Sequence, residues 1–205
     1  MIKTKQDYEY YLEADRIALG RTKKLSLRWR LIRLLIEPDY VWDFQKLLRK
    51  VEYLTNKKCN IFDRINRVIQ YRKFYRLSLK LGYYIHPNNF GPGLCIIHPG
   101  GIMVNADVRI GANCVISNHV TIGFETRFSE GDPPTIGNNV YIGPGARIFG
   151  SITIADNIAI GAGSVVNKSF TEEGITIAGV PAKKVSERGS SGIIKATELV
   201  NLSHC

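Results

Sequence analysis

Residues 94–101 read LCIIHPGG, an apolar run followed by one histidine, a proline and two glycines. The imidazole of His98 could fill space, bind a metal ion or take a proton from a reacting group. An imidazole has a reference pKa of about 6.5, so near neutral pH it is available as a base. Which role applies depends on the elements that position His98.

Other residues with reactive side chains are few. His86, His119 and His204 are the remaining histidines. Four cysteines are scattered without any CxxC pair: Cys59, Cys95, Cys114 and Cys205. This usage favours a reducing compartment and argues against a disulfide framework or a zinc knuckle. No serine or cysteine stands in a recognisable nucleophile arrangement, and we expect Cys95 and Cys114 to be small wall residues.

Charge divides the chain into two parts. The net charge is +10, and mean hydropathy is −0.08. Residues 1–80 carry 20 Lys and Arg against 9 Asp and Glu, a net of +11, whereas residues 81–205 carry 8 against 9, a net of −1. No apolar run approaches the roughly 18–20 residues that span a bilayer. We therefore expect two modules, of which the first is basic.

The basic module shows helical periodicity. Between Asn60 and Gly82, apolar residues recur at spacings near three and four, which predicts a helix capped by Asn60 and ended by Gly82. An earlier leucine-rich stretch breaks at Pro38, and a second helix is expected from Asp39. In all, about three helices are predicted by these patterns.

From about residue 84 the sequence repeats every six residues. An Ile or Val leads each unit, at Val104, Ile110, Ile116, Ile122, Ile136, Ile142, Ile148, Ile154, Ile160 and Val166. Small residues follow, and Gly, Asn and Asp tolerate the positive φ of tight corners. The period predicts a parallel β-helix of triangular cross-section, in which three units make one coil and the leading aliphatics stack inside.

One interruption breaks this repeat. Ile122 and Ile136 are fourteen residues apart, one unit of six plus eight extra residues. A solenoid wall cannot absorb eight residues, so we expect an ejected loop at about 127–135. Such a loop can line a site, although a neutral surface insertion is the alternative.

The repeats, the segments IHPNNFGPGLCIIHPGG and HVTIG and the closing AGVPAKKV together resemble the hexapeptide-repeat acyltransferases. The closest branch is the serine acetyltransferase-like one, which includes many O-acetyltransferases of capsule and surface-glycan synthesis. The resemblance covers 84–185 and extends weakly to YLEADRIAL near the N-terminus. It implies a mainly β fold, a left-handed parallel β-helix (83–185) after an α-helical module (1–82), with 186–205 as a polar tail.

The resemblance also implies an activity and a base. Members assemble as homotrimers, bind acetyl-CoA between neighbouring subunits and use a histidine as general base. His98 matches the position of that base, with Gly101 as the matching glycine. His119, at a turn position, could line the acceptor pocket, but a structural role is favoured. Some hexapeptide β-helices bind zinc through three histidines, yet His86, His98 and His119 lack that spacing, so we expect no metal.

Matching positions also indicate where acetyl-CoA would bind. Small residues allow close approach, and lysines suit phosphate groups as point charges. The set implied by the family is Gly143, Ala146, Ala162, Lys168, Lys183 and Lys184. Gly and Ala are also required by the coil itself, so each position is weak support taken alone.

Three departures from the family pattern bear on the acceptor. Tyr84 and Ile97 occupy places where true serine acetyltransferases carry aspartates, and Asp132-Pro133-Pro134 replaces a loop Arg-His-Pro. Because a serine zwitterion needs charged partners, we expect a neutral acceptor, a sugar or glycan hydroxyl, with Asp132 in the acceptor site. Serine O-acetyltransferase and a catalytically silent trimeric scaffold are the alternatives. The group that orients His98 is left open.

The net positive charge of the basic module favours an anionic binding partner. No nucleic-acid-binding motif is present, so we expect no nucleic acid partner. KKLSLRWRLIRLL, with Trp29, has the composition of an interfacial helix, which would allow peripheral contact with the inner face of the membrane by an otherwise cytoplasmic protein. Packing of its leucines against the β-helix, with the charges in solvent, is slightly favoured over this. Whether trimers pair into hexamers through this module is open.

Overall fold

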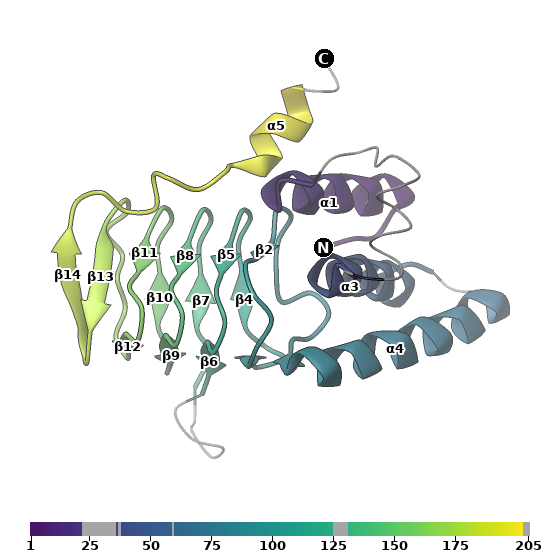
Figure 1. Cartoon of the computed structure of the whole chain (residues 1–205), viewed down its shortest axis with the longest axis horizontal. Coiled ribbons are helices and arrows are strands. Elements are labelled where there is room, and N and C mark those ends of the chain that lie inside the picture. Colours follow the sequence, from purple (N-terminus) through teal and green to yellow (C-terminus); the bar gives the residue numbers. More distant parts are fainter. Residues whose placement is uncertain (22–35, 37, 59, 125–130, 203–205) are drawn as a thin grey trace.

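The structure is a computed structural model that describes residues 1–21, 36, 38–58, 60–124 and 131–202. Its N-terminal helices are α1 (Lys5–Ala18), α3 (Tyr40–Asn56) and α4 (Ile61–Leu81), gathered at one end of the molecule (Figure 1). None of the helices in these ranges is long and apolar enough to cross a membrane. The interfacial segment predicted around Trp29 lies outside the described residues.

The helix boundaries predicted from the sequence are confirmed. The side chain of Asp39 accepts a hydrogen bond from the backbone N–H of Trp42 (3.3 Å) and begins α3. Asn60 caps α4 in the same way through Asp63 (2.8 Å), and Gly82 ends α4 in a left-handed conformation with φ of 72°. Strand β1 starts directly afterwards, next to the predicted boundary at 82–83. That the two parts are separate domains stays a prediction.

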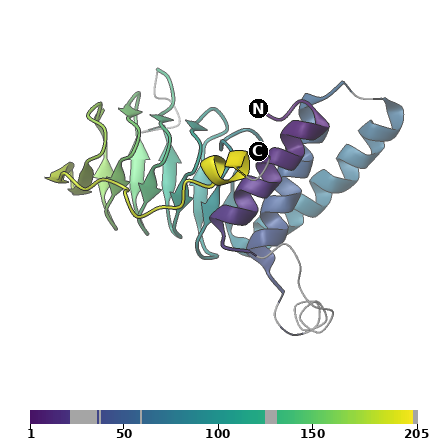
Figure 2. The same cartoon turned by 90° about the horizontal axis from the view of Figure 1, so that it is seen from above.

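Short strands form the rest of the molecule. Their bounds are β1 (Tyr83–Tyr84), β2 (Cys95–Ile96), β3 (Ile102–Val104), β4 (Arg109–Ile110), β5 (Val115–Ile116), β6 (Thr121–Gly123), β7 (Thr135–Ile136), β8 (Tyr141–Ile142), β9 (Arg147–Phe149), β10 (Thr153–Ile154), β11 (Ala159–Ile160), β12 (Val165–Val166), β13 (Thr176–Gly179) and β14 (Ala182–Ser186). They build sheet A (β1-β3-β6-β9-β12), sheet B (β4-β7-β10) and sheet C (β2-β5-β8-β11-β13-β14). Up to β13, successive strands pass from sheet to sheet, and among the described strands only β13 and β14 pair antiparallel. The chain therefore winds through three sheets into a three-sided prism, and Figure 2 shows its successive coils from above.

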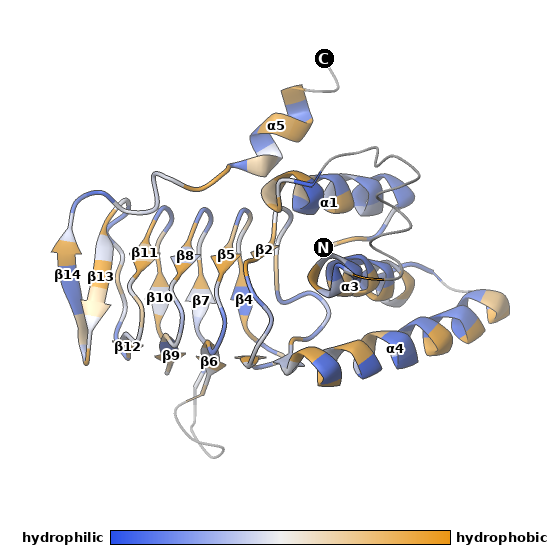
Figure 3. Ribbon diagram, viewed as in Figure 1, coloured by the Kyte–Doolittle hydropathy of each residue, from blue (hydrophilic) through white to orange (hydrophobic). Residues whose placement is uncertain are grey.

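The prism is filled by the residues that lead the repeats. All ten leading aliphatics are at most 4% exposed, and strands such as β5, β8 and β11 are largely orange in Figure 3. Ile116 pairs in register with Ile96 in one neighbouring coil and with Ile142 in the other. Ile142 and Ile160 are 18 residues apart, whereas Ile116 and Ile142 are 26 apart, so eight extra residues leave the wall without shifting the register.

These extra residues leave between β6 and β7. Residues 131–134 of the predicted loop are described, and 125–130 lie outside the described residues. The backbone carbonyl of Asp132 accepts a hydrogen bond from Ser151 Oγ (2.9 Å). The end of the loop is thus held on the next coil.

An asparagine ladder runs along one corner of the prism. Asn113, Asn139 and Asn157 all have positive φ, between 56° and 60°. The side-chain amide of Asn113 donates to Asn139 Oδ1 (2.9 Å), and that of Asn139 donates to Asn157 Oδ1 (3.0 Å). Asparagine tolerates the left-handed region better than most residues, so these side chains allow the corner and also link the coils.

A buried ion-pair cluster joins the helices to the prism. Arg49 of α3 is fully buried and donates to Asp15 of α1 (2.8 Å), to Glu52 (2.9 Å) and to the carbonyls of Phe90 and Gly91. Asp15 also accepts hydrogen bonds from the backbone N–H groups of residues 93 and 94. A buried charge is tolerated only when it is paired and hydrogen-bonded in this way.

The C-terminal segment is not a polar tail that turns away, which corrects the sequence-based interpretation. It runs back along the prism toward α1 (Figures 1 and 2). Ser190 N–H donates to the carbonyl of Asn157 (3.0 Å), and Thr197 exchanges hydrogen bonds with Asn113. Helix α5 (Ala196–Leu202) contacts α1, and Ala196 and Val200 are buried. The apolar residues of 193–202, which include Ile193, Ile194 and Val200, were the signal for this docking.

Candidate active site

The candidate site lies where the chain passes from sheet C to sheet A. We call this the C–A corner, formed by residues 97–101, 117–120, 143–146 and 161–164. The backbone N–H of Gly145 donates to the carbonyl of Asn118 (3.0 Å), and that of Gly163 donates to Pro144 (2.8 Å). The turns that carry His98, His119, Gly143 and Ala162 are therefore stacked in one column along the prism.

His98 is exposed at the first turn of this column. Its backbone carbonyl accepts a hydrogen bond from the hydroxyl of Tyr83 (3.1 Å). Burial raises the pKa of Tyr83, so this hydroxyl stays protonated as a donor. Gly100 N–H donates to the carbonyl of Leu81 (3.2 Å). The last residues of α4 and the first of β1 thus hold the turn of His98.

His119 lies on the next coil, against the turn of His98. It is exposed and has φ of 59°. A Cβ added to Gly101 would stand 3.2 Å from His119 Nδ1. The glycine therefore leaves room for the imidazole ring. The structure brings His98, Gly101 and His119 together at one corner.

The two positions that lack the family's aspartates carry uncharged side chains, and only Ile97 is next to His98. Tyr84 packs edge-on against the ring of His86, with centroids 4.7 Å apart. Ile97 is exposed beside His98. In the described ranges no side chain hydrogen-bonds the ring of His98, so the group that orients it does not come from these parts of the same chain.

The small residues predicted for the cofactor differ in what they can contact. A Cβ on Gly143 would lie 2.8 Å from the backbone of the next coil, at Ile160 O and Ala162 N. Glycine is therefore required there by the spacing of the coils. Ala146 is fully buried in the prism, so only its backbone could contribute to cofactor binding. Ala162 is exposed on the corner. Cofactor binding by either residue stays a prediction.

The predicted lysines lie away from this column. Lys168 is at the opposite edge of sheet A, with its ammonium 5.4 Å from the centre of the Phe170 ring. Lys183 and Lys184 are on β14, at the far end of the prism. Lys184 forms ion pairs with Glu172 and Glu187 (2.8 Å to the latter), whereas Lys183 makes no ion pair with the described residues. Lys183 is the better candidate for phosphate binding.

Asp132 and the end of the loop also lie apart from His98. The loop projects from the corner where the chain passes from sheet A to sheet B. We call this the A–B corner, formed by residues 85–89, 105–108, 131–134, 150–152 and 167–169. Sheet A separates this corner from the C–A corner. One chain alone therefore does not place Asp132 next to the imidazole.

A hollow of about 440 Å³ adjoins the C–A corner on the outer face of sheet C. Its lining includes Cys95, Val115 and Tyr141, with residues 189–194 of the C-terminal segment over them, and Ile97 at one edge. Burial raises the pKa of the Cys95 thiol to about 11. At neutral pH Cys95 is a neutral wall residue and not a nucleophile.

Histidines do not converge on a metal site in the part of the chain that is described. His86 lies at the A–B corner, across sheet A from His98 and His119. Burial lowers the pKa of His86, although Asp107 opposes this shift. No group of three metal-ligating side chains occurs among the described residues.

Comparisons with known proteins agree with this geometry. Residues 133–168 match the family model for the bacterial transferase hexapeptide (six repeats). A serine acetyltransferase of Synechococcus elongatus is 36% identical over 112 residues, covering 54% of this chain and 46% of that protein. A serine acetyltransferase of Helicobacter pylori is 33% identical over 133 residues, covering 60% of this chain and 77% of that protein. This chain belongs to the serine acetyltransferase-like hexapeptide acyltransferases. It spans less than half the length of the Synechococcus relative.

Solved structures of this family share the fold. The crystal structure of serine acetyltransferase in complex with coenzyme A from Brucella abortus matches with a TM-score of 0.68 and 29% sequence identity, covering 90% of this chain and 70% of that chain. The match confirms the left-handed parallel β-helix preceded by helices that the sequence predicts.

Proposed function

We propose that this chain is an acetyl-CoA-dependent O-acetyltransferase in which His98 is the general base. The observation that carries the proposal is the exposed imidazole of His98 at one end of a column of turns, in a chain that belongs to this family. His98 would take the proton from an acceptor hydroxyl as the hydroxyl oxygen attacks the thioester carbonyl. The C–S bond then breaks, and the leaving thiolate takes up the proton from the imidazolium.

The C–A corner suits the acetyl donor. Exposed small residues such as Ala162 allow a flexible pantetheine arm to lie close to the backbone. The backbone N–H groups of Gly100 and Gly145 are used by the fold, so the oxyanion would need other donors. Lys183, at the far end of the prism from His98, is placed to meet a phosphate group as a point charge.

Serine is the acceptor that the comparisons support, since both relatives described above are named serine acetyltransferases. They do not support the sugar or glycan acceptor that the sequence favoured. One observation keeps a neutral hydroxyl as a second candidate: the residue directly before His98 is the exposed Ile97 and not a carboxylate. An ammonium group would find no anionic partner there within the described part of one chain.

An acceptor competition tests the proposal. The purified protein is incubated with labelled acetyl-CoA, with L-serine and with a panel of neutral sugars, and the labelled product is identified. Acetylation of serine supports the first candidate, and acetylation of a sugar with serine inert supports the second. If the protein neither transfers acetyl to a hydroxyl nor binds acetyl-CoA, both acceptor candidates are overturned. The protein would then be a catalytically silent scaffold.

We further propose that the protein is a homotrimer. Apolar residues along α4 follow a heptad pattern and face outward, each 55–65% exposed: Ile61, Ile65, Val68, Tyr75 and Leu79. Sheet A continues this surface with Tyr84 and Met103, which are paired on β1 and β3 and are also exposed. A seam with heptad spacing is typical of helices that pack on copies of themselves. We call these seven residues the α4 seam.

A trimer would also complete the site. If the C–A corner of one copy faces the A–B corner of the next, the end of the loop with Asp132 and the side chain of Lys168 lie on the partner's side of the groove. A partner group could then orient His98. Because its acetyl donor is a cytoplasmic metabolite, we expect the enzyme to act in the cytoplasm.

A further inference from the structure

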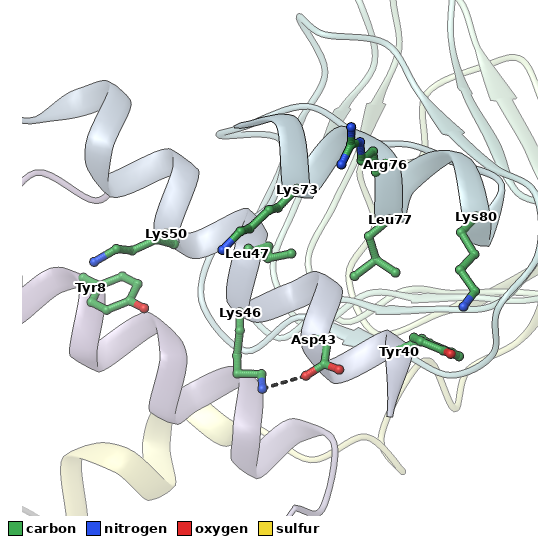
Figure 4. A pocket seen from close by; sticks show the side chains of 10 residues that line it. All are labelled: Tyr8, Tyr40, Asp43, Lys46, Leu47, Lys50, Lys73, Arg76, Leu77 and Lys80. Atoms are coloured by element: carbon green, nitrogen blue, oxygen red, sulfur yellow. Dashed lines mark ion pairs between the residues drawn. The ribbon is translucent and has the colours of Figure 1, made fainter. Parts of the chain in front are cut away.

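A second concave site lies in the helical module, and none of its lining residues belongs to the C–A corner. It is a groove of about 760 Å³ between α3 and α4, closed at one end by α1 (Figure 4). Its lining residues are Tyr8, Tyr40, Asp43, Lys46, Leu47, Lys50, Lys73, Arg76, Leu77 and Lys80. We call it the basic groove. Its volume is in the range of small-molecule sites.

Five cations and one carboxylate line the basic groove. Asp43 pairs with Lys46 (2.7 Å), which leaves four positive charges in excess. The ammonium of Lys80 lies 3.7 Å from the centre of the Tyr40 ring, and that of Lys50 lies 5.3 Å from the Tyr8 ring. Cation–π contacts hold an ammonium in place without neutralising its charge.

Lys73 and Arg76 give the strongest indication that the basic groove binds an anion. Neither forms an ion pair with any residue that the structure describes, and both are exposed on the wall of the groove. Helix α4 as a whole has six Lys and Arg against one Asp, and that aspartate, Asp63, pairs with Lys57 instead. The chain itself therefore supplies little negative charge to this wall.

The charges of Lys73 and Arg76 are not needed to anchor α4. Helix α4 is anchored by Phe74, Ser78 and Leu81, which are buried against the rest of the molecule. The α4 seam occupies a different face of the helix, about a third of a turn away from Lys73 and Lys80. Like charges around an empty groove repel each other. A bound anion would reduce this electrostatic repulsion, for which the packing of α4 gives no reason.

We propose that the basic groove binds a small organic anion with two or more phosphate groups. Lys73 and Lys80 are seven residues apart, which places their backbone positions about 10 Å apart along α4. This spread suits phosphates at separate points of one molecule better than a single phosphate. Arg76 can bind a phosphate in a bidentate manner, and the lysines act as point charges. Leu47 and Leu77 offer an apolar floor to the body of the ligand.

Titration calorimetry with ATP and with inorganic pyrophosphate tests this proposal on the full-length protein at 100 mM salt. Coenzyme A is left out because it would also occupy the proposed donor site. The groove variant is Lys73→Gln with Arg76→Gln. The matched control is Arg64→Gln with Arg67→Gln, which removes two charges from the same helix outside the groove.

We expect binding of ATP or pyrophosphate by the wild type and at least tenfold weaker binding by the groove variant. The control should stay within twofold of the wild type, and circular dichroism should show that both variants are folded. A parallel arm with phosphatidylinositol-bisphosphate vesicles and with phosphatidylcholine vesicles identifies the source. If the wild type binds phosphatidylinositol-bisphosphate vesicles but neither ATP nor pyrophosphate, and the groove variant weakens that binding, the phosphates belong to a lipid headgroup. Equal losses in both variants, or no binding of any phosphate probe, would overturn the proposal.

Discussion

At the scale of residues, the column at the C–A corner separates side chains that the coil requires from those that are free to act. Gly143 is fixed by the 2.8 Å approach of the next coil, and Ala146 fills the core. His98, His119 and Ala162 are exposed. A single sequence does not separate these two groups, because glycine and alanine serve both purposes and only the facing direction distinguishes them.

Lys183 and Lys184 offer a test of donor binding at this scale. Lys184 is already paired with Glu172 and Glu187. Binding of the phosphate groups of acetyl-CoA should therefore depend on Lys183. We expect Lys183→Gln to raise the KM for acetyl-CoA about fivefold, the effect of roughly 1 kcal/mol. Lys184→Gln is the matched control and should change KM less than twofold in a steady-state assay. A larger effect at Lys184 would contradict the assignment.

At the scale of elements, polar side chains fix the corners of the prism and its junction with the helices. The asparagine ladder links successive coils, and the C-terminal segment docks on it through Ser190 and Thr197. Arg49 joins α1 and α3 to the first coil. Each contact spans residues far apart in sequence.

Asn139 tests the ladder. Its φ is 56°, and its side chain both accepts from Asn113 and donates to Asn157. Asn139→Ala should lower the free energy of unfolding by about 2 kcal/mol, because it loses both hydrogen bonds and keeps an unfavourable φ. Asn139→Gly loses the bonds only and should cost about half as much. Urea unfolding measures both, and equal stabilities would contradict a conformational role.

Arg49 tests the junction. Arg49→Met leaves Asp15 and Glu52 buried without their cation, and we expect a loss of about 3–5 kcal/mol. Lys5→Met removes one partner of an exposed pair with Glu9 and should change stability by less than about 1 kcal/mol. If thermal unfolding shows similar small shifts for both variants, the cluster does not hold the helices to the prism.

The sequence predicts the regular parts of these elements and misses the contacts between them. The six-residue period determines which side chains face inward, because each coil repeats the same geometry, so all ten leading aliphatics are buried as expected. Caps such as Asn60 are local and were also predictable. The pairing of Arg49 with Asp15 and the docking of Thr197 on Asn113 depend on tertiary geometry that has no local signal.

Helix α4 shows the same limit. Its apolar spacing correctly predicts a helix, but much of that apolar face is directed outward and not into the core of the chain. Periodicity identifies the face that avoids water and does not say whether the same chain or another copy covers it.

At the scale of the whole molecule, the α4 seam and the separation of Asp132 from His98 both point to assembly. The seam includes residues of α4 and of strands β1 and β3 in sheet A, so one surface could join both modules of neighbouring copies. Lys73 and Lys80 of the basic groove lie on a different face of α4 from the seam, whereas Arg76 lies closer to it.

Light scattering with size-exclusion chromatography tests the trimer. We expect a mass of about 69 kDa, three times the 23.0 kDa of one chain. Ile65→Glu with Leu79→Glu places charges in the α4 seam and should shift the protein toward monomers with loss of transfer activity. Ile194→Glu, an exposed apolar position outside the seam, is the control and should stay trimeric. A monomeric wild type would contradict the assembly.

The most direct test of the account is acetyl transfer by His98→Ala, measured with saturating acetyl-CoA and the acceptor found in the competition assay. Loss of a general base lowers turnover by about a hundredfold or more, and binding of acetyl-CoA, measured by calorimetry, should change little. His119→Ala, one coil away on the same corner, should retain at least a tenth of the wild-type rate. Near-normal turnover of His98→Ala would contradict the account, because the proton would then be taken by another group.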